Sequence, residues 1–288
     1  MITHPFTYQA PATIEEAVKQ LGKNGDAKVI AGGHSLLPLM KLGLAQPETL
    51  VDLRRIASLR EIRTEADGTI VIGALVTHRD LVHDKTVRPK LDALADAASE
   101  VGDLQVRARG TIGGSLAHAD SAADEPAPTL AYAATIRAIG PKGQRDIPAG
   151  DFFKGTFETA LAENEIITEI RFPAPTGRTG GAYAKFAHPA SGFAVTGVAA
   201  VITITDGTIE RAAIGVTGAT AAPYRATGAE KALTGTKGDA KAIADAAAKA
   251  ADGITALSDL AASAEYRKHL VTIYAKRAIQ RAIERART

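Results

Sequence analysis

Two glycine pairs occur in similar surroundings far apart in the chain. The first lies in residues 31–35, which read AGGHS, and the second in residues 111–115, which read TIGGS. A glycine pair lets backbone N–H groups converge on an anion without interference from a Cβ atom, and each segment also ends in a hydroxyl side chain. We therefore expect these two glycine segments to bind one extended ligand with two phosphates, which suggests a dinucleotide cofactor.

The best-known phosphate-binding motifs are absent from the chain. Neither G-x-G-x-x-G nor G-K-S/T occurs, so the phosphates would be held by backbone N–H groups and by hydroxyls, without a motif lysine. The hydroxyls in question belong to Ser35, Thr111 and Ser115. Ser35 is also expected to cap a following helix, whose positive N-terminal end would favour an anion.

Several other polar or aromatic residues near these segments could contribute chemistry. His34 and His118 could each serve as a base, or could be hydrogen-bonded loop residues. Asp120 and Asp124 are spaced like a carboxylate pair for acid and base work, but a sugar hydroxyl also needs a carboxylate acceptor, and we favour that role for Asp124. Phe193 could pack in a core or cover a ring of the ligand. No residue is predicted to be catalytic.

The composition excludes several classes of function. The net charge is +2, from 34 basic and 32 acidic side chains, which argues against a protein that coats nucleic acid. The absence of cysteine excludes disulfides, thiolate nucleophiles and any iron–sulfur cluster held by this chain. The seven histidines show no metal-ligand spacing, and no G-x-S-x-G motif supports a hydrolase, so no metal is predicted. No signal peptide or membrane span is recognisable, which predicts a cytoplasmic protein.

The first part of the chain mixes helical and strand-like patterns, which predicts an α+β fold. A helix begins at Thr13, where the spacing to Glu16 fits a capping box. A strand, a helix and a second strand follow around the first glycine segment, as in a small βαβ-like unit. The expected strands are residues 28–31, 49–53, 69–74, 134–140 and 165–172, and the expected helices are residues 13–21, 35–42, 77–82, 87–98 and 126–134.

A run of proline and glycine in residues 173–181 predicts a linker between two domains. Three strands, residues 182–186, 195–204 and 209–216, are expected after it, with a hairpin turn at Asp206 and Gly207. The remaining residues are rich in alanine and predict helices over 239–251 and 264–287.

These motifs resemble the FAD-binding subunit of the molybdenum hydroxylase, or xanthine dehydrogenase, family, and most closely its carbon monoxide dehydrogenase branch. The resemblance is carried by residues 31–41, residues 110–115 and Asp124, and it extends over essentially the whole chain. It implies a FAD-binding domain of the vanillyl-alcohol-oxidase (PCMH) type in residues 1–176, with lobes of about 1–57 and 58–176. A C-terminal domain in residues 177–288 would hold a three-stranded antiparallel sheet and a helical bundle.

The resemblance implies a non-covalently bound FAD. The glycine segments would bind its pyrophosphate and Asp124 its sugar chain, while Ile167 and Lys185 fall where the family places residues near the flavin. Two positions depart from the family pattern, because Phe193 replaces a tyrosine beside the isoalloxazine and Ser115 replaces a common asparagine. The implied cofactor-binding residues are Ile30, Ala31, Gly32, Gly33, His34, Ser35, Leu36, Thr111, Ile112, Gly113, Gly114, Ser115, His118, Asp120, Asp124, Ile167, Lys185 and Phe193.

The same resemblance implies an electron-transfer subunit. A small partner with two [2Fe–2S] clusters would feed the FAD, and a large partner with a molybdenum cofactor would oxidise the substrate, in a dimer of heterotrimers. A quinone or another carrier would accept the electrons, and the complex could attach to the inner face of the membrane. Carbon monoxide is the favoured substrate, and a purine, nicotine or another N-heterocycle is the alternative. A free-standing FAD oxidase and a non-catalytic nucleotide-binding protein remain open as other classes.

Overall fold

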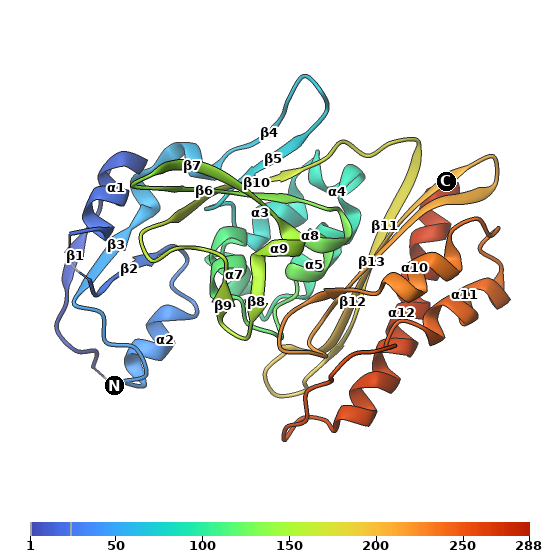
Figure 1. Cartoon of the computed structure of the whole chain (residues 1–288). Helices are drawn as coiled ribbons and strands as arrows, with labels where there is room; N and C mark the ends of the chain where they lie inside the picture. The colour runs from blue at the N-terminus through green and yellow to red at the C-terminus, as the bar shows by residue number, and fades with distance from the viewer. Residues whose placement is uncertain (1, 24) are drawn as a thin grey trace.

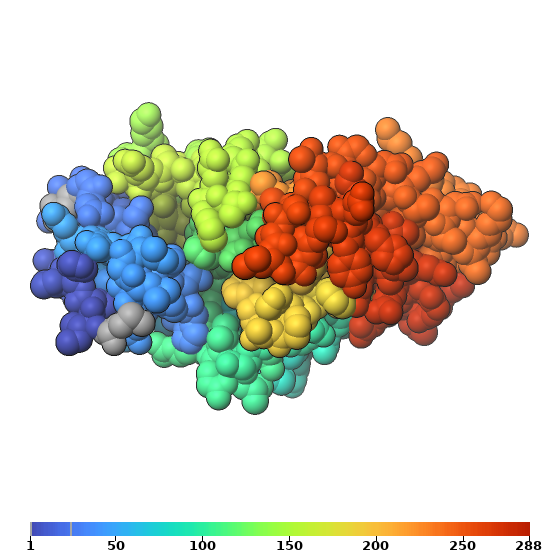
Figure 2. Space-filling view, turned by 90° about the horizontal axis from the view of Figure 1, so that it is seen from below, coloured from blue at the N-terminus to red at the C-terminus, as the bar shows by residue number. Residues whose placement is uncertain are grey.

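The computed structural model describes residues 2–23 and 25–288, which form three parts arranged in a row (Figure 1). A small lobe with a three-stranded sheet lies at the N-terminal end, and a larger sheet with helices occupies the middle. A second sheet backed by a long helix forms the C-terminal end. From below, the blue N-terminal lobe is separated from the red C-terminal helices by the green middle part (Figure 2). The predicted α+β class is confirmed.

The N-terminal lobe is a parallel sheet in which β3 lies between β1 and β2. Because α2 joins the parallel pair β2 and β3, the predicted βαβ-like unit is confirmed. Thr13 caps α1 by accepting the N–H of Glu16 at 3.2 Å. Ser35 holds the N-cap position of α2, but the predicted side-chain cap is wrong, because its backbone is helical and not extended. The elements are β1 (Thr7–Gln9), α1 (Ile14–Leu21), β2 (Ala27–Ile30), α2 (Leu36–Lys41), β3 (Thr49–Asp52), η1 (Leu53–Arg55) and η2 (Ala57–Arg60).

The middle part is built on an antiparallel sheet with the strand order β4-β5-β10-β6-β7. Ile170 in β10 lies opposite Ile72 in β5 and Ile136 in β6, and all three side chains are fully buried. Residues of α5 and α8 belong to the same apolar cluster, so helices cover this face of the sheet. The elements are β4 (Ile62–Thr64), β5 (Ile70–Gly73), α3 (His78–His83), α4 (Val87–Lys90), α5 (Asp92–Glu100), α6 (Leu104–Arg107), α7 (Ile112–His118), α8 (Pro126–Ala131), β6 (Thr135–Gly140), β7 (Gly143–Pro148), α9 (Ala149–Phe152), β8 (Phe153–Gly155), β9 (Glu158–Thr159) and β10 (Ile166–Phe172).

Two helices of the middle part differ from their predicted extents. The helix predicted over 87–98 is divided into α4 and α5, because Leu91 leaves the helical region with ψ of 47° and buries its side chain completely. Helix α8 ends at Ala131, and Ala133 then adopts a left-handed backbone with φ of 53°. Both breaks lie next to buried apolar side chains: Leu91 is buried at the first, and Tyr132 and Ala134 are buried on either side of the exposed Ala133 at the second.

The C-terminal part holds an antiparallel sheet with the order β11-β12-β13-β14. The predicted hairpin turn is confirmed: Asp206 and Gly207 have φ of 50° and 74°, as a type I′ turn requires. The three expected strands are joined by a short fourth strand, which pairs with β13 through Gly215 and Val216. The elements are β11 (Arg178–Ala187), β12 (Ala194–Thr205), β13 (Thr208–Thr217), β14 (Tyr224–Arg225), α10 (Thr227–Leu233), α11 (Ala240–Ala248) and α12 (Ala264–Arg287).

Strand β12 is buried on both faces and joins the last two parts. Ala199 and Val201 belong to the apolar cluster of the middle part, whereas Val198 and Ala200 belong to a second cluster with α12. The second sheet therefore forms a layer between the central helices and α12. The predicted domain boundary after residue 176 falls in the connection between β10 and β11, and the predicted lobe boundary near residue 57 falls at the start of η2; both stay predictions.

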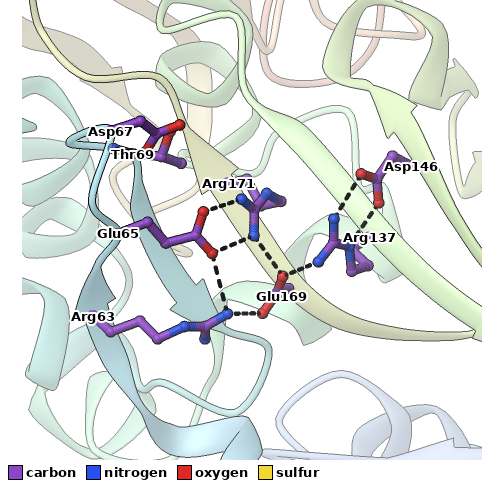
Figure 3. Close-up of polar contacts among 8 residues, drawn as sticks. All are labelled: Arg63, Glu65, Asp67, Thr69, Arg137, Asp146, Glu169 and Arg171. Carbon is purple, nitrogen blue, oxygen red and sulfur yellow. Dashed lines mark hydrogen bonds and ion pairs between the residues drawn. The ribbon is translucent and has the colours of Figure 1, made fainter.

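The other face of the central sheet carries a network of ion pairs (Figure 3). Glu169 in β10 lies at its centre and accepts hydrogen bonds from Arg63 at 2.7 Å, Arg137 at 2.8 Å and Arg171 at 2.9 Å. Arg137 also pairs with both carboxylate oxygens of Asp146. Opposite charges thus alternate along the neighbouring strands β10, β6 and β7, and Arg63 of β4 reaches Glu169 across β5, so the network supports the register of the sheet.

Glu169→Gln removes the charge that three arginines share. We expect the free energy of unfolding to fall by about 1–2 kcal/mol, because charge-assisted hydrogen bonds to a side chain only 12% exposed are weakened. Asp146→Asn is the matched control: its side chain is 43% exposed and pairs with Arg137 alone, so it should cost about 0.5 kcal/mol or less. Urea unfolding at low salt measures both variants, and equal losses would contradict a network centred on Glu169.

Candidate functional site

The first glycine segment (residues 31–35) and the second (residues 111–115) lie against each other. A Cβ atom built on Gly32 would lie 2.8 Å from the Cα atom of Gly110, closer than real Cβ atoms approach a backbone. One built on Gly114 would lie 3.8 Å from the Cβ atom of Ala31. The structure thus brings together two segments that are distant in sequence, and the absence of a side chain at Gly32 is what permits the contact.

The first glycine segment contains four consecutive backbone N–H groups without an acceptor. Within the described part of the chain, the N–H groups of residues 32–35 donate to no carbonyl or side chain. Gly33 has φ of +75°, a conformation that L side chains rarely adopt, so the chain bends here. Successive N–H groups on such a bend form an anion-binding concavity. The ring of His34 lies with Nδ1 3.0 Å from the Gly32 carbonyl oxygen, which agrees with the hydrogen-bonded loop alternative.

The second glycine segment is not the loop that the sequence predicted. It forms the first turn of α7, where Ile112 and Gly113 donate their N–H groups to the carbonyls of Val76 and Ala74, both at 3.0 Å. The Gly114 N–H donates to Oγ1 of the capping residue Thr111 at 3.1 Å. The N–H groups that the glycine pair was expected to offer to an anion therefore donate to acceptors within the protein. The segment instead offers a close approach to the first glycine segment and the hydroxyls of Thr111 and Ser115.

A buried ion pair that no sequence motif indicated contacts the second glycine segment. His78 Nδ1 is 2.5 Å from Glu125 Oε1, and the two side chains are 5% and 1% exposed. Ser115 Oγ is 2.8 Å from Glu125 Oε2 and donates to it. Burial lowers the pKa of His78, but the attraction of Glu125 outweighs it and the pKa is raised above its ordinary value. Burial raises the pKa of Glu125, but His78 and Ser115 outweigh it and the pKa is lowered.

Asp124 lies in a second buried polar group, formed with two residues of β11. The Tyr183 hydroxyl donates to Asp124 Oδ1 at 2.6 Å, and Lys185 Nζ donates to Oδ2 at 3.0 Å and to the Glu100 carbonyl at 2.7 Å. Burial raises the pKa of Asp124 to about 6. Asp120 instead accepts the N–H of Ala122 at 2.9 Å in a local turn. The structure thus pairs Asp124 with Lys185, a contact that neither the spacing nor the residue pattern predicted.

The other residues that were predicted to contact the cofactor lie in different environments. Phe193 is 50% exposed, so the alternative that it packs in a core is wrong, and its contact with a ring stays a prediction. His118 lies against Phe157 with ring centroids 4.9 Å apart, and burial lowers its pKa. The aliphatic members pack into the protein, namely Ile30 with Leu36 in the N-terminal lobe, and Ile112 with Ile167 in the middle part.

The arrangement offers amide, hydroxyl and carboxylate groups for binding. Among the residues that the structure describes, no group of three or more His, Asp or Glu side chains could hold a metal ion. None of the described helices combines the length and apolar character that a bilayer span requires. The site therefore supplies amide donors, hydroxyls and charge-balanced carboxylates, which suit the recognition of a polar, anionic ligand.

Comparison with known families and proteins covers nearly the whole chain. Residues 4–175 match the FAD binding domain in molybdopterin dehydrogenase, and residues 181–282 match the CO dehydrogenase flavoprotein C-terminal domain. The carbon monoxide dehydrogenase medium chain of Hydrogenophaga pseudoflava is 43% identical over 284 residues, which cover 98% of each chain. The 6-hydroxypseudooxynicotine dehydrogenase complex subunit alpha of Paenarthrobacter nicotinovorans is 36% identical and covers 98% of this chain and 96% of its own.

Solved structures give the same result. A chain of carbon monoxide dehydrogenase from Hydrogenophaga pseudoflava, in a form that lacks the Mo-pyranopterin moiety, superposes with a TM-score of 0.95 over 99% of both chains at 43% identity. A chain of quinoline 2-oxidoreductase from Pseudomonas putida 86 superposes with a TM-score of 0.93 over 100% of both chains at 33% identity.

Asp124 should stay protonated to a higher pH than an ordinary aspartate, because burial raises its pKa to about 6. Since the folded-state pKa exceeds the unfolded value, unfolding releases a proton between about pH 4 and 6, and the contribution of this group to stability falls as pH rises through that window. Infrared difference spectra of the full chain should show a carboxylic acid band with a midpoint near pH 6.

Two variants assign this band. Asp124→Asn should abolish it, whereas Asp120→Asn, which removes a partly exposed carboxylate four residues away, should leave it in place. A band that persists in Asp124→Asn, or a wild-type midpoint near pH 4, would contradict the assignment.

Proposed function

Because this chain belongs to the medium, FAD-binding subunits of the molybdopterin hydroxylase family, we propose that it binds one FAD non-covalently between the two glycine segments and passes electrons through it. It is an oxidoreductase subunit of the carbon monoxide dehydrogenase type. Bound flavin accepts electrons singly and releases them in pairs, which no side chain of this protein can do.

The approach of Gly32 to Gly110 is the observation that carries the proposal. It brings the unpartnered N–H groups of residues 32–35 next to Thr111, whose hydroxyl proton has no acceptor among the described residues. These donors fit a pyrophosphate. A Cβ atom at Gly33 would lie 3.0 Å from the Leu37 side chain, so the absence of a side chain there lets the bend that carries these N–H groups pack against α2. The residues present therefore fit the implied cofactor, with amides and a hydroxyl at its phosphates.

The route of the electrons is proposed from the family together with the composition. Since the chain contains no cysteine, iron–sulfur clusters must lie in another subunit. We propose a small partner with two [2Fe–2S] clusters and a large partner with the molybdenum cofactor, assembled as a dimer of heterotrimers. Electrons would pass from the small subunit through this chain to a quinone or another carrier. This complex would lie in the cytoplasm, with peripheral attachment to the inner face of the membrane.

Carbon monoxide is the proposed substrate of the large subunit. Two relatives with 43% and 39% identity are named carbon monoxide dehydrogenase medium chains, and they support this choice. A nicotine-type N-heterocycle is the second candidate, because a relative named nicotine 6-hydroxylase medium subunit is 36% identical over 94% of this chain. In this proposal the residues of this chain lie at the cofactor and not at the substrate. The large subunit therefore determines whether the complex oxidises carbon monoxide or an N-heterocycle.

Purification of the intact complex through a tag on this chain, from its native host, tests the proposed function. We expect flavin and iron–sulfur absorption, one FAD per chain after heat release, and two partner chains by mass spectrometry, because the clusters and molybdenum cofactor must be supplied by other subunits. Flavin without partners would favour a free-standing flavin oxidase. A complex without flavin would contradict the proposal.

Gly33→Val tests the location of the cofactor. We expect loss of FAD, because a branched side chain is strained at φ of +75° and would crowd Leu37 and Ile30, so the backbone that carries the free N–H groups must shift. Gly43→Val is the matched control: it imposes the same strain at φ of +73°, in the same lobe but after α2. FAD content after gel filtration measures both. Normal flavin in Gly33→Val, or equal loss in both variants, would contradict binding at the first glycine segment.

A further inference from the structure

Two adjacent carboxylates, Asp124 and Glu125, are buried, and each pairs with a cation from another element. Lys185 of β11 pairs with Asp124, and His78, the first residue of α3, pairs with Glu125. The proposed function gives no role to His78 or to Glu125. Because their side chains are 5% and 1% exposed, bulk water can stabilise neither charge, and each depends on the other.

Glu125 decides where the proton of the Ser115 hydroxyl lies. Next to an imidazolium, Glu125 is ionised and has no proton, so the 2.8 Å hydrogen bond between Oε2 and Ser115 Oγ must use the serine proton. The Ser115 hydroxyl then has only lone pairs left for a ligand. Thr111 differs, because its Oγ1 accepts the Gly114 N–H and its proton remains available.

The same ion pair supports the backbone beside the first glycine segment. The His78 N–H donates to the Gly110 carbonyl at 3.1 Å, and a Cβ atom on Gly110 would lie 2.6 Å from His78 Nε2. Thr77, directly before it, forms an isolated antiparallel bridge with Thr111. A shift of the His78 ring would therefore be transmitted to the residues that contact Gly32.

We propose that the His78–Glu125 ion pair positions Ser115 as a hydrogen-bond acceptor, so that Ser115 binds a sugar hydroxyl of the cofactor and not a phosphate oxygen. The inference rests on the proposed function, because it takes FAD as the ligand. The donors of FAD nearest to its pyrophosphate are hydroxyls of the ribityl chain and the ribose, and these fit an acceptor. The phosphates are left to Thr111 and to the N–H groups of residues 32–35, which changes the role that the sequence predicted for Ser115.

A double-mutant cycle on the full chain, stripped of cofactor and titrated with FAD by fluorescence, tests this assignment. Ser115→Ala and Glu125→Leu, which removes both acceptor oxygens, should each weaken FAD binding about fivefold, the value of one net hydrogen bond. If Glu125 acts through Ser115, the double variant should bind FAD no more weakly than Ser115→Ala alone. A purely structural role would lower the thermal stability of the cofactor-free chain and weaken binding equally in both backgrounds, which would overturn the proposal, as would an unchanged Kd in Glu125→Leu.

A second measurement needs only Ser115→Ala and does not depend on the folding of Glu125→Leu. The inhibition constant of inorganic pyrophosphate against FAD should be the same in Ser115→Ala and wild type, because Ser115 does not donate to phosphate. An inhibition constant of pyrophosphate that is severalfold higher in Ser115→Ala than in wild type would overturn the assignment. A wild-type chain that binds neither FAD nor pyrophosphate would instead contradict the proposed function, so the two failures are distinct.

Discussion

The site depends on the close backbone contact between Gly32 and Gly110. Neither residue has room for a side chain. A Cβ atom on Gly32 would collide with Gly110, and one on Gly110 would collide with the ring of His78. Three layers of chain are thus packed in contact: the first glycine segment, the residues before α7, and the start of α3. The free N–H groups of residues 32–35 lie next to Thr111 because this packing holds the N-terminal lobe against the middle part.

The two glycine pairs look equivalent in the sequence but serve different physical purposes. In the first, Gly33 adopts a left-handed backbone and the neighbouring N–H groups stay unpaired. In the second, Gly113 lets α7 approach Ala74 so closely that a Cβ atom would lie 2.5 Å from the alanine Cβ. Both pairs let backbone segments approach closely, but only the first leaves a run of N–H groups without an acceptor among the described residues. Short motifs that are alike in sequence therefore differ in their backbone hydrogen bonds.

Local pattern accounts for much of the fold, because capping at Thr13, the turn at Asp206 and the apolar strands depend on neighbours in sequence. It fails where tertiary contacts oppose local preference. Glycine disfavours helix, yet α7 forms across Gly113 since the carbonyl of Ala74 satisfies its N–H. The pairing of His78 with Glu125 was not predictable, because neither residue carries a motif and only the tertiary fold brings the first residue of α3 next to the residue before α8.

The second sheet completes the charge balance of the site. Tyr183 and Lys185, which bind Asp124, lie on β11, and β11 is held in place by its pairing with β12, which is buried on both faces. Without that sheet, Asp124 would lose both of its partners while Glu125 kept its own. The C-terminal domain is therefore part of the candidate site, even though the glycine segments that characterise the family all precede it. The electrostatics of the candidate site depend on how the second sheet packs against the middle part, as well as on the glycine segments.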